Sequence, residues 1–338
     1  ENVKRSYNKD GCTYYTYENF KNSINRGLGL VEKLSTKFKY EEDRFITLTN
    51  EQIAFFNRLK NNKNILVSGY AGTGKTIIAL ATAKEKLDDD KTVLFLCYNR
   101  TLANKIRYKF DKNDDRIEVT TFHSIAKKII GDKDPSWWAK SYKKDNDDFW
   151  SLDIPIKLES VIDNHVKMFD TIIIDEGQDF KELWFETIFR MCKSDGYKYV
   201  FADPLQDIFS REGTIPNKNE FFEIELDVNC RNTKKIVSHL SETINKDIES
   251  HQKSPIGEVV SKETFKSKDE LVKSLKDEIT KLIKKHSILP EQILLMTNSN
   301  INESSISDLW KIGKISVKPI NRSGRLDRGN IHYASINK

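Results

Sequence analysis

The sequence has few cysteines, and they are not clustered. It contains four Cys in 338 residues, with no Cys-x-x-Cys pair and no nearby group of His residues. Zinc sites and disulfide frameworks need such clusters, so both are excluded as main features of the chain. We expect reduced, mostly structural thiols at Cys12, Cys97, Cys192 and Cys230.

Long apolar runs and targeting patterns are also missing. No stretch approaches the length that crosses a bilayer, and the start shows no signal-peptide pattern. These absences predict a cytoplasmic protein with no membrane partner. The net charge of +5 fits a nucleic-acid partner but is common in proteins that bind none. A length of 338 residues favours two domains over one compact core.

Short apolar segments alternate with longer helical patterns in the first two thirds of the chain. Such segments, often unbroken, are typical of strands covered on both faces, and the alternation indicates a parallel, doubly wound α/β sheet. The expected strands are residues 65–67, 93–96, 117–119, 172–174, 199–201 and 222–224, and the expected helices are 77–87, 102–110 and 183–192.

Changes in this pattern suggest the domain organisation. Residues 126–161 are expected to form an insertion against the first domain, where three tryptophans (Trp137, Trp138 and Trp150) favour a small core over a base-stacking surface. After Leu226 a second α/β pattern begins, with helices near 233–248 and 269–286 and a strand at 293–296. We therefore expect a lead segment (1–45), a first domain (46–225) and a partial second domain (226–338).

The strongest motif is a phosphate-binding loop between an expected strand and an apolar helix. Its pattern is Gly-x-x-x-x-Gly-Lys-Thr, from Gly69 to Thr76. Glycines let backbone N–H groups turn toward phosphate oxygens, and the helix N-terminus adds its positive end. Lys75 is expected to reach the β- and γ-phosphates and Thr76 to bind Mg²⁺, so ATP and Mg²⁺ are the expected cofactors. The expected ATP-binding residues are Gly69, Ala71, Gly72, Thr73, Gly74, Lys75 and Thr76.

A pair of carboxylates follows the expected strand at 172–174. Ligands bind at the carboxyl ends of strands in open α/β sheets, where Asp175 and Glu176 would lie. Asp175 would hold Mg²⁺, and Glu176 would orient and deprotonate the water that attacks the γ-phosphate. Alone, such a pair is as often a simple turn; beside a phosphate loop it indicates ATP hydrolysis.

The phosphate loop and the run Asp175-Glu176-Gly177-Gln178-Asp179 resemble the ATP-binding motifs of superfamily 1 DNA helicases of the UvrD/Rep type. The resemblance extends over roughly residues 47–338. It implies a P-loop NTPase with a RecA-like first domain and a partial RecA-like second domain, and adds Gln178 to the ATP site. The implied activity is ATP-driven movement on single-stranded DNA with duplex unwinding.

Three further segments resemble ATP-site motifs of this family. Residues 48–52 resemble the glutamine motif, which implies that Gln52 reads adenine, although Thr49 and Gln52 could form a helix capping box. Residues 202–209 resemble motif III, which implies that Gln206 senses the γ-phosphate and that Phe209 stacks on a base or packs in the core. Residues 226–232 resemble motif IV, which implies that Arg231 reaches from the second domain toward the γ-phosphate.

Two more segments resemble motifs that contact DNA. Residues 95–103 resemble motif Ia and residues 120–126 resemble motif Ic. The resemblance implies contacts of Asn99, Arg100, Thr121 and His123 with the phosphates of single-stranded DNA. His123 could instead be a structural residue beside the sheet.

The sequence departs from the family in several places. Gly177 stands where the family usually has Ala, motifs V and VI would follow about residue 338, and residues before about Phe45 match no motif. We expect a part of a longer polypeptide. Two segments also resemble bacterial proteins in which a nuclease-related domain precedes the helicase: the phosphate loop and Cys97-Tyr98-Asn99-Arg100. Some of these proteins act in antiviral (phage) defence. A nuclease domain or subunit is therefore an expected partner, beside a possible role in DNA repair.

Two other functions remain compatible with these motifs. One is a regulatory ATPase whose nucleotide state sets its affinity for a partner without any unwinding. The other is a catalytically inert assembly module. Fold and motor motifs do not by themselves distinguish these classes.

Overall fold

We analysed a computed structural model of the chain. It describes residues 7–8, 11–12, 53–54, 56, 62–141, 148–162, 166–203, 221–298, 303–307, 309–320 and 327–335. The chain divides into two compact units, each described below by itself. The larger unit comprises Asp43–Lys262 and Asn321–Arg325, and the smaller unit comprises Glu1–Glu42, Glu263–Ile320 and Leu326–Lys338.

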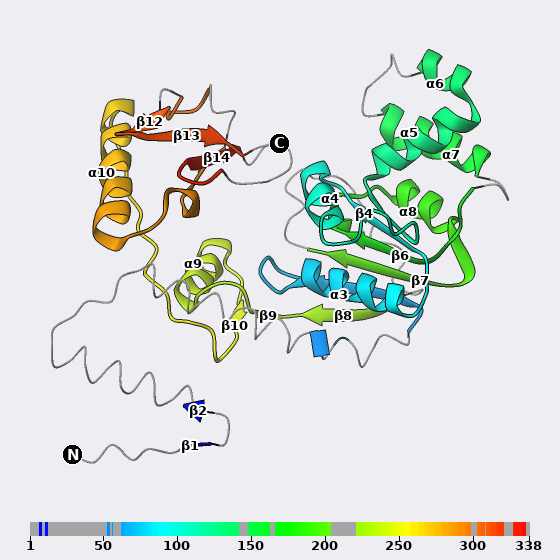
Figure 1. Cartoon of the computed structure of the whole chain (residues 1–338), viewed down its shortest axis with the longest axis horizontal. Coiled ribbons are helices and arrows are strands. Elements are labelled where there is room, and N and C mark those ends of the chain that lie inside the picture. The colour runs from blue at the N-terminus through cyan, green and yellow to red at the C-terminus, as the bar shows by residue number, and fades with distance from the viewer. Residues whose placement is uncertain are drawn as a thin grey trace. The chain divides into compact units, whose positions relative to one another are not determined.

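The larger unit is built on a six-stranded parallel sheet (Figure 1). The strands follow the spatial order β5-β4-β6-β7-β3-β8, and every neighbouring pair is parallel. All six strands expected from the sequence are confirmed, as is the α/β class with a parallel sheet. Their bounds are β3 Asn64–Gly69, β4 Val93–Cys97, β5 Ile117–Thr120, β6 Phe169–Asp175, β7 Cys192–Ala202 and β8 Phe222–Leu226.

Both faces of the central strands of this sheet are buried, which explains their unbroken apolar runs. Alternate residues of one strand point to opposite faces. Along β6, for example, Ile172 and Ile174 belong to one core cluster and Ile173 to the other. The first cluster includes residues of α5 (Phe122–Lys133), α7 (Ile154–Val161) and α8 (Glu182–Phe189), and the second includes residues of α3 (Lys75–Asp88) and α4 (Arg100–Arg107).

One helix ends earlier than the sequence predicts. The expected helix 183–192 is α8, which ends at Phe189, whereas Cys192 begins β7. Cys192 pairs with Phe169 of β6, and the register then shifts before Thr171 pairs with Tyr197. The pairing with β6 therefore takes Cys192, the last residue of the expected helix, into the sheet.

The expected insertion is helical and shares the core of the larger unit. It contains α6 (Pro135–Ser141), the π-helix η2 (Phe149–Asp153) and α7. Phe149, Ile154 and Leu158 are fully buried in the first core cluster. Three partly buried residues of the insertion, Trp137, Trp138 and Trp150, pack against that cluster, so the core interpretation of the tryptophans is confirmed.

The segment after β8 belongs to the larger unit. The two-residue strand β9 (Val228–Asn229) pairs in parallel with β10 (Glu249–Ser250), and α9 (Lys234–Ile244) lies between them in the sequence. The contacts thus keep this segment with the sheet, whereas the sequence pattern predicts a domain boundary at residue 226. The assignment of functional domains stays a prediction.

The smaller unit contains a four-stranded sheet and one long helix. The strand order is β11-β14-β13-β12, parallel except for the β12–β13 pair. The expected apolar face of α10 (Lys268–His286) is confirmed: Ile279 is buried in the core of this unit, and Leu271, Leu275 and Leu282 pack against it. The strands are β11 Leu294–Thr297, β12 Lys311–Ile312, β13 Ile315–Pro319 and β14 Ile331–Ser335, and β1 (Tyr7–Asn8) pairs with β2 (Gly11–Cys12).

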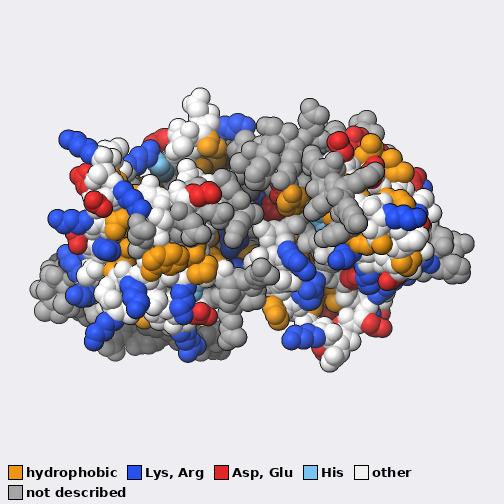
Figure 2. All heavy atoms as spheres, turned by 90° about the horizontal axis from the view of Figure 1, so that it is seen from above, with side chains coloured by type: hydrophobic (Ala, Val, Ile, Leu, Met, Phe, Trp, Pro, Cys, Tyr) orange, Lys and Arg blue, Asp and Glu red, His pale blue; other side chains and the backbone are white. Residues whose placement is uncertain are grey.

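The surface of the described residues is charged and mixed. Figure 2 shows Lys and Arg side chains spread over the visible face, with Asp and Glu between them. Among the helices that the structure describes, none is long and apolar enough to cross a membrane.

Trp184 is expected to be a main contributor to the stability of the larger unit. It is 2% exposed, its ring stacks on Phe122 at 4.2 Å between centroids, and its indole N–H donates to the Trp150 carbonyl at 2.8 Å. Trp184→Ala should lower the free energy of unfolding by about 3–5 kcal/mol, because it leaves a cavity and a lost hydrogen bond. Urea titration followed by circular dichroism measures this change.

Trp310 provides the matched control, because it is 49% exposed in the smaller unit. Trp310→Ala should change the free energy of unfolding by less than about 1 kcal/mol. Equal losses in the two variants would contradict the core position of Trp184.

Candidate nucleotide site and neighbouring groove

Three strand ends of the larger unit meet at one edge of the sheet. Because all six strands are parallel, their carboxyl ends lie at the same edge, where open α/β sheets bind ligands. The phosphate loop follows β3, Asp175 ends β6, and Asp203 follows β7, the strand that lies between them in the sheet. Lys75 Nζ lies 3.5 Å from Asp203 Oδ2, and both side chains are buried.

The predicted loop residues enclose the ammonium group of Lys75. Gly72 and Gly74 have φ of 87° and 93°, a left-handed conformation that favours glycine, and Gly74 directly precedes the first turn of α3. Lys75 Nζ donates to the carbonyls of Gly69 (2.6 Å) and Tyr70 (3.1 Å). The same Tyr70 carbonyl accepts the N–H of Thr73 at 3.2 Å. The loop thus places a buried cation at the N-terminus of a helix, where anions bind.

Asp175 and Thr76, the two predicted Mg²⁺ ligands, lie together. Asp175 is fully buried, its Oδ1 atom accepts the N–H of Glu176 at 3.1 Å, and the nearby Thr76 side chain lowers the pKa of the carboxyl group. Its Oδ2 atom is buried without a hydrogen-bond partner among the described residues. Burial, together with the charge of Glu176, raises the pKa of Asp175 to about 7. A carboxylate with a spare oxygen beside a hydroxyl matches the oxygen ligands that Mg²⁺ prefers, so these residues fit the ion.

Glu176 is held by a side chain for which the sequence predicts a different role. Glu176 has a left-handed backbone (φ 57°, ψ 46°), an uncommon conformation for a residue other than glycine that is often found at functional sites. The amide nitrogen of Gln178 donates to Glu176 Oε2 at 2.7 Å, and its oxygen accepts the N–H of Asp203 at 2.9 Å. The buried Gln178, expected among the ATP-binding residues, therefore connects Glu176 to the end of β7.

The departure of Gly177 from the family pattern has a packing explanation. A Cβ atom at this position would lie 2.8 Å from Cγ1 of Val200 on β7, which is too close. Glycine thus lets the turn after Glu176 approach the neighbouring strand.

Two residues of the site were missed by the sequence analysis, and one of them could have been found. Asp203 follows an expected strand in the same way as Asp175 follows its own, so the strand-then-Asp pattern was available as a signal. Asn229 donates from its side-chain amide to the Ala71 carbonyl at 2.8 Å. No sequence pattern points to that contact, because the two residues lie 158 positions apart.

The predicted γ-phosphate sensors are only partly described. Arg231 is exposed and belongs to the same compact unit as the phosphate loop, two residues after Asn229. Its role toward the γ-phosphate stays a prediction. Gln52, Gln206 and Phe209 lie outside the described residues.

A groove of about 630 Å³ lies between α4 and the start of α5. Two of the four predicted DNA contacts, Arg100 and Thr121, line it. Asn99 caps α4 instead, since its side chain accepts the N–H groups of Thr101 and Leu102. The full lining is Arg100, Thr101, Ala103, Asn104, Arg107, Thr120, Thr121 and Ser124.

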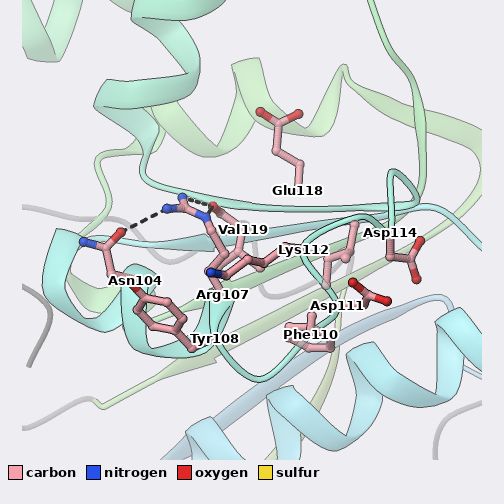
Figure 3. A pocket seen from close by; sticks show the side chains of 10 residues that line it. Asn104, Arg107, Tyr108, Phe110, Asp111, Lys112, Asp114, Glu118 and Val119 are labelled. Carbon is pink, nitrogen blue, oxygen red and sulfur yellow. Dashed lines mark hydrogen bonds between the residues drawn. The ribbon is translucent and has the colours of Figure 1, made fainter. Parts of the chain in front are cut away.

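The groove is bounded by an arginine that is held in place. Arg107 Nη1 donates to Asn104 Oδ1 at 3.0 Å, and Nε donates to the Val119 carbonyl at 3.2 Å. Figure 3 shows this guanidinium group between α4 and β5, in the wall of a second cavity of about 460 Å³ that shares Asn104 and Arg107 with the groove. Arg107 therefore supports the groove, while the exposed Arg100 is the cation best placed to contact a ligand in it.

His123 packs in an aromatic cluster. Its ring centroid lies 4.4 Å from Trp150 and 5.1 Å from Trp184, and the residue is half-buried. These contacts support the structural alternative for His123, and its predicted contact with DNA stays a prediction.

Asp175→Asn is expected to raise the melting temperature of the nucleotide-free protein, increasingly so at higher pH. The folded-state pKa of Asp175 lies above its ordinary value of 3.8, so its stabilising contribution is present below that value and is lost as the pH rises toward 7. Asn does not titrate and escapes this loss. Thermal unfolding between pH 5 and 8 should show a gap that grows to about 3–5 °C.

Asp195→Asn is the control with the opposite sign. Lys63 lowers the pKa of the exposed Asp195, so any stability that this carboxylate contributes is present at neutral pH. A melting-temperature gap that is constant from pH 5 to 8 for Asp175→Asn would contradict the buried, destabilised carboxylate.

Comparison with known proteins agrees with the nucleotide site at a coarse level. Residues 62–215 match the model of the Schlafen group 3, DNA/RNA helicase domain. No curated protein matches the chain. Similar solved structures include a DNA replication initiation factor (13% identity, 58% of this chain, 50% of that chain, TM-score 0.25). Another is AMPPCP-bound DnaA from Aquifex aeolicus (13% identity, 56% of this chain, 47% of that chain, TM-score 0.25).

The chain spans about half the length of these two structures. The match of residues 62–215 and the geometry of the loop agree with each other. The larger unit of this chain therefore has the fold of a P-loop NTPase, and its matched region is similar to a helicase domain.

Proposed function

We propose that this chain is a superfamily 1 motor that couples hydrolysis of Mg²⁺-ATP to movement on single-stranded DNA and to separation of the duplex. The observation that carries the proposal is the position of Glu176. Its carboxylate is held by Gln178 at the same sheet edge as Lys75 and Asp175. This combination supports hydrolysis and not only nucleotide binding.

Each described residue then has a defined task. The phosphate loop would bind the phosphates through its N–H groups, and Lys75 would exchange its contacts with Gly69, Tyr70 and Asp203 for phosphate oxygens. Thr76 and Asp175 would hold Mg²⁺, which neutralises phosphate charge when bound. Glu176 would accept a proton from the attacking water.

Gln178 connects hydrolysis to the rest of the sheet in this proposal. It bonds both Glu176 and the backbone N–H of Asp203, at the start of the motif III-like segment. A change at the γ-phosphate would therefore reach the end of β7 through one side chain. Gln206 and Arg231 would complete the response at the γ-phosphate.

The groove supports single-stranded DNA as the partner. Arg100 offers a cation, and Thr101 and Ser124 offer hydroxyl groups, which are typical contacts to phosphates. Thr121 caps α5, and its hydroxyl donates to Ser124 Oγ at 3.0 Å, so it supports the groove from inside. These residues follow the carboxyl ends of β4 and β5, at the same edge of the sheet as the ATP site. Such contacts position a strand without reading its sequence.

The ATPase rate of the full chain is expected to rise severalfold with single-stranded DNA. Lys75→Ala and Glu176→Gln should each lower the stimulated rate by at least about 100-fold, because one removes the phosphate cation and the other the base. A coupled-enzyme assay at matched salt measures both effects. A rate that is unaffected by DNA would instead favour the regulatory ATPase without unwinding.

Arg100→Ala is expected to weaken DNA binding at every sequence. It should also reduce the slope of log affinity against log salt by about one, as expected for the loss of one phosphate contact. Fluorescence anisotropy with labelled oligo-dT, and with an RNA oligomer for comparison, measures this effect. Lys105→Ala is the control, because Lys105 is an exposed cation on α4 that does not line the groove. Equal losses for both variants would contradict the groove as the binding path.

A further inference from the structure

We infer that Asn229 is a positioning residue of the nucleotide site, which holds the phosphate loop in its binding conformation from outside. This inference rests on the proposed function, since it assumes that the loop binds nucleotide. Asn229 is 0% exposed and follows the edge strand β8 by three residues.

The contacts of the Asn229 segment fix two carbonyl groups of the loop. The side-chain amide of Asn229 donates to the Ala71 carbonyl at 2.8 Å, and the backbone N–H of Cys230 donates to the Gly72 carbonyl at 3.0 Å. In a trans peptide unit the C=O and N–H groups point in opposite directions. Fixing these carbonyls therefore turns the N–H groups of Gly72 and Thr73 away from Asn229.

The side to which the Thr73 N–H group turns is the side of Lys75. The N–H of Thr73 points at the Tyr70 carbonyl (3.2 Å), which also accepts from Lys75 Nζ (3.1 Å). Backbone N–H groups directed to the side of a buried cation form an anion-binding loop. Asn229 thus selects the orientation of the loop without reaching the ligand itself.

The orientation of the Asn229 amide is itself determined. Its Oδ1 atom accepts the backbone N–H groups of Arg231 (3.2 Å) and Asn232 (3.0 Å) and the Asn232 side chain (3.3 Å). These donors fix the oxygen, so the nitrogen must face the loop. Only one orientation of the Asn229 amide lets its oxygen accept these N–H groups while its nitrogen donates to the Ala71 carbonyl.

The close fit at Gly72 shows that the contact needs a glycine in the loop. A Cβ on Gly72 would lie 2.5 Å from the side-chain nitrogens of both Asn229 and Asn232. The two amides therefore lie directly on the loop backbone. The glycine at position 72, which the motif itself leaves open, is explained by this contact as well as by its φ of 87°.

The segment that carries Asn229 is anchored on the sheet and on a second strand pair. Leu226 pairs with Gly69 at the end of β3, and the Asn229 carbonyl accepts the N–H of His251 at 3.1 Å beside the β9–β10 pair. Asn229 is thus part of a rigid neighbour, which lets it determine the shape of a glycine-rich loop.

Binding of fluorescent ADP and steady-state hydrolysis by the full chain test this role in Asn229→Ala and Asn229→Asp. The Asp variant keeps the acceptor for Arg231 and Asn232 but loses the donor to Ala71. We expect nucleotide affinity to fall by roughly tenfold or more in both. The turnover rate at saturating ATP should fall less than about threefold, because Lys75, Asp175 and Glu176 are unchanged.

Asn113→Asp is the matched control, since Asn113 is exposed in the larger unit and away from the loop. It should bind nucleotide as the wild type does. If Lys75→Ala binds as tightly as the wild type, the proposed function fails and this inference fails with it. If Lys75→Ala loses binding but both Asn229 variants keep it, the proposed function stands and this inference is overturned.

Hydrogen exchange on the wild type provides a test that does not depend on folding of the variants. ADP should slow exchange in residues 226–232 together with residues 69–76, because the Cys230 N–H is bonded to the loop. Unchanged exchange in 226–232 alongside protection of the loop would overturn the inference.

Discussion

The burial of one ammonium group and two carboxylates at a single sheet edge is the constraint on which the rest of the site depends. Buried charges are costly unless they are paired or take up an ion. Lys75 meets this cost with two backbone carbonyls and Asp203, whereas Asp175 keeps one oxygen without a described partner and has a raised pKa. The site is therefore poised to exchange these contacts for phosphates and a cation.

The parallel sheet makes this burial possible. β7 lies between β3 and β6 in the sheet, so the width of one strand separates the phosphate loop from Asp175. The side chains of Asp203 and Gln178 lie between the loop and the Asp175–Glu176 pair. Asp203 balances Lys75 on one side, and Gln178 reaches Glu176 on the other. The strained backbone of Glu176 is tolerated because this bond and the close packing of Gly177 on β7 hold the turn.

Sequence patterns predicted the local features of this fold and missed the long-range ones. The six strands, the phosphate loop and the Asp175–Glu176 pair were predictable, because burial on both faces and phosphate binding each impose a residue pattern within a short window. The contact of Asn229 with Ala71 spans 158 positions and leaves no periodic signal. The capping role of Asn99 and the aromatic packing of His123 were open for a similar reason, since one residue type serves both structure and ligand binding.

The phosphate loop follows β3, whose two neighbours in the sheet are β7 and β8. The chain after each of these neighbours contacts the loop, but the two contacts differ in their chemistry. The chain after β7 supplies a carboxylate to the Lys75 ammonium, a contact that an incoming phosphate can replace. The chain after β8 supplies the Asn229 amide to a loop carbonyl, a contact that a phosphate cannot replace, because it satisfies an acceptor on the outer side. Nucleotide binding should therefore replace the contacts on the β7 side of the loop and strengthen those on the β8 side. The change in contacts caused by ATP would then reach Asp203, Gln178 and Glu176, while the Asn229 segment keeps its contacts with the loop.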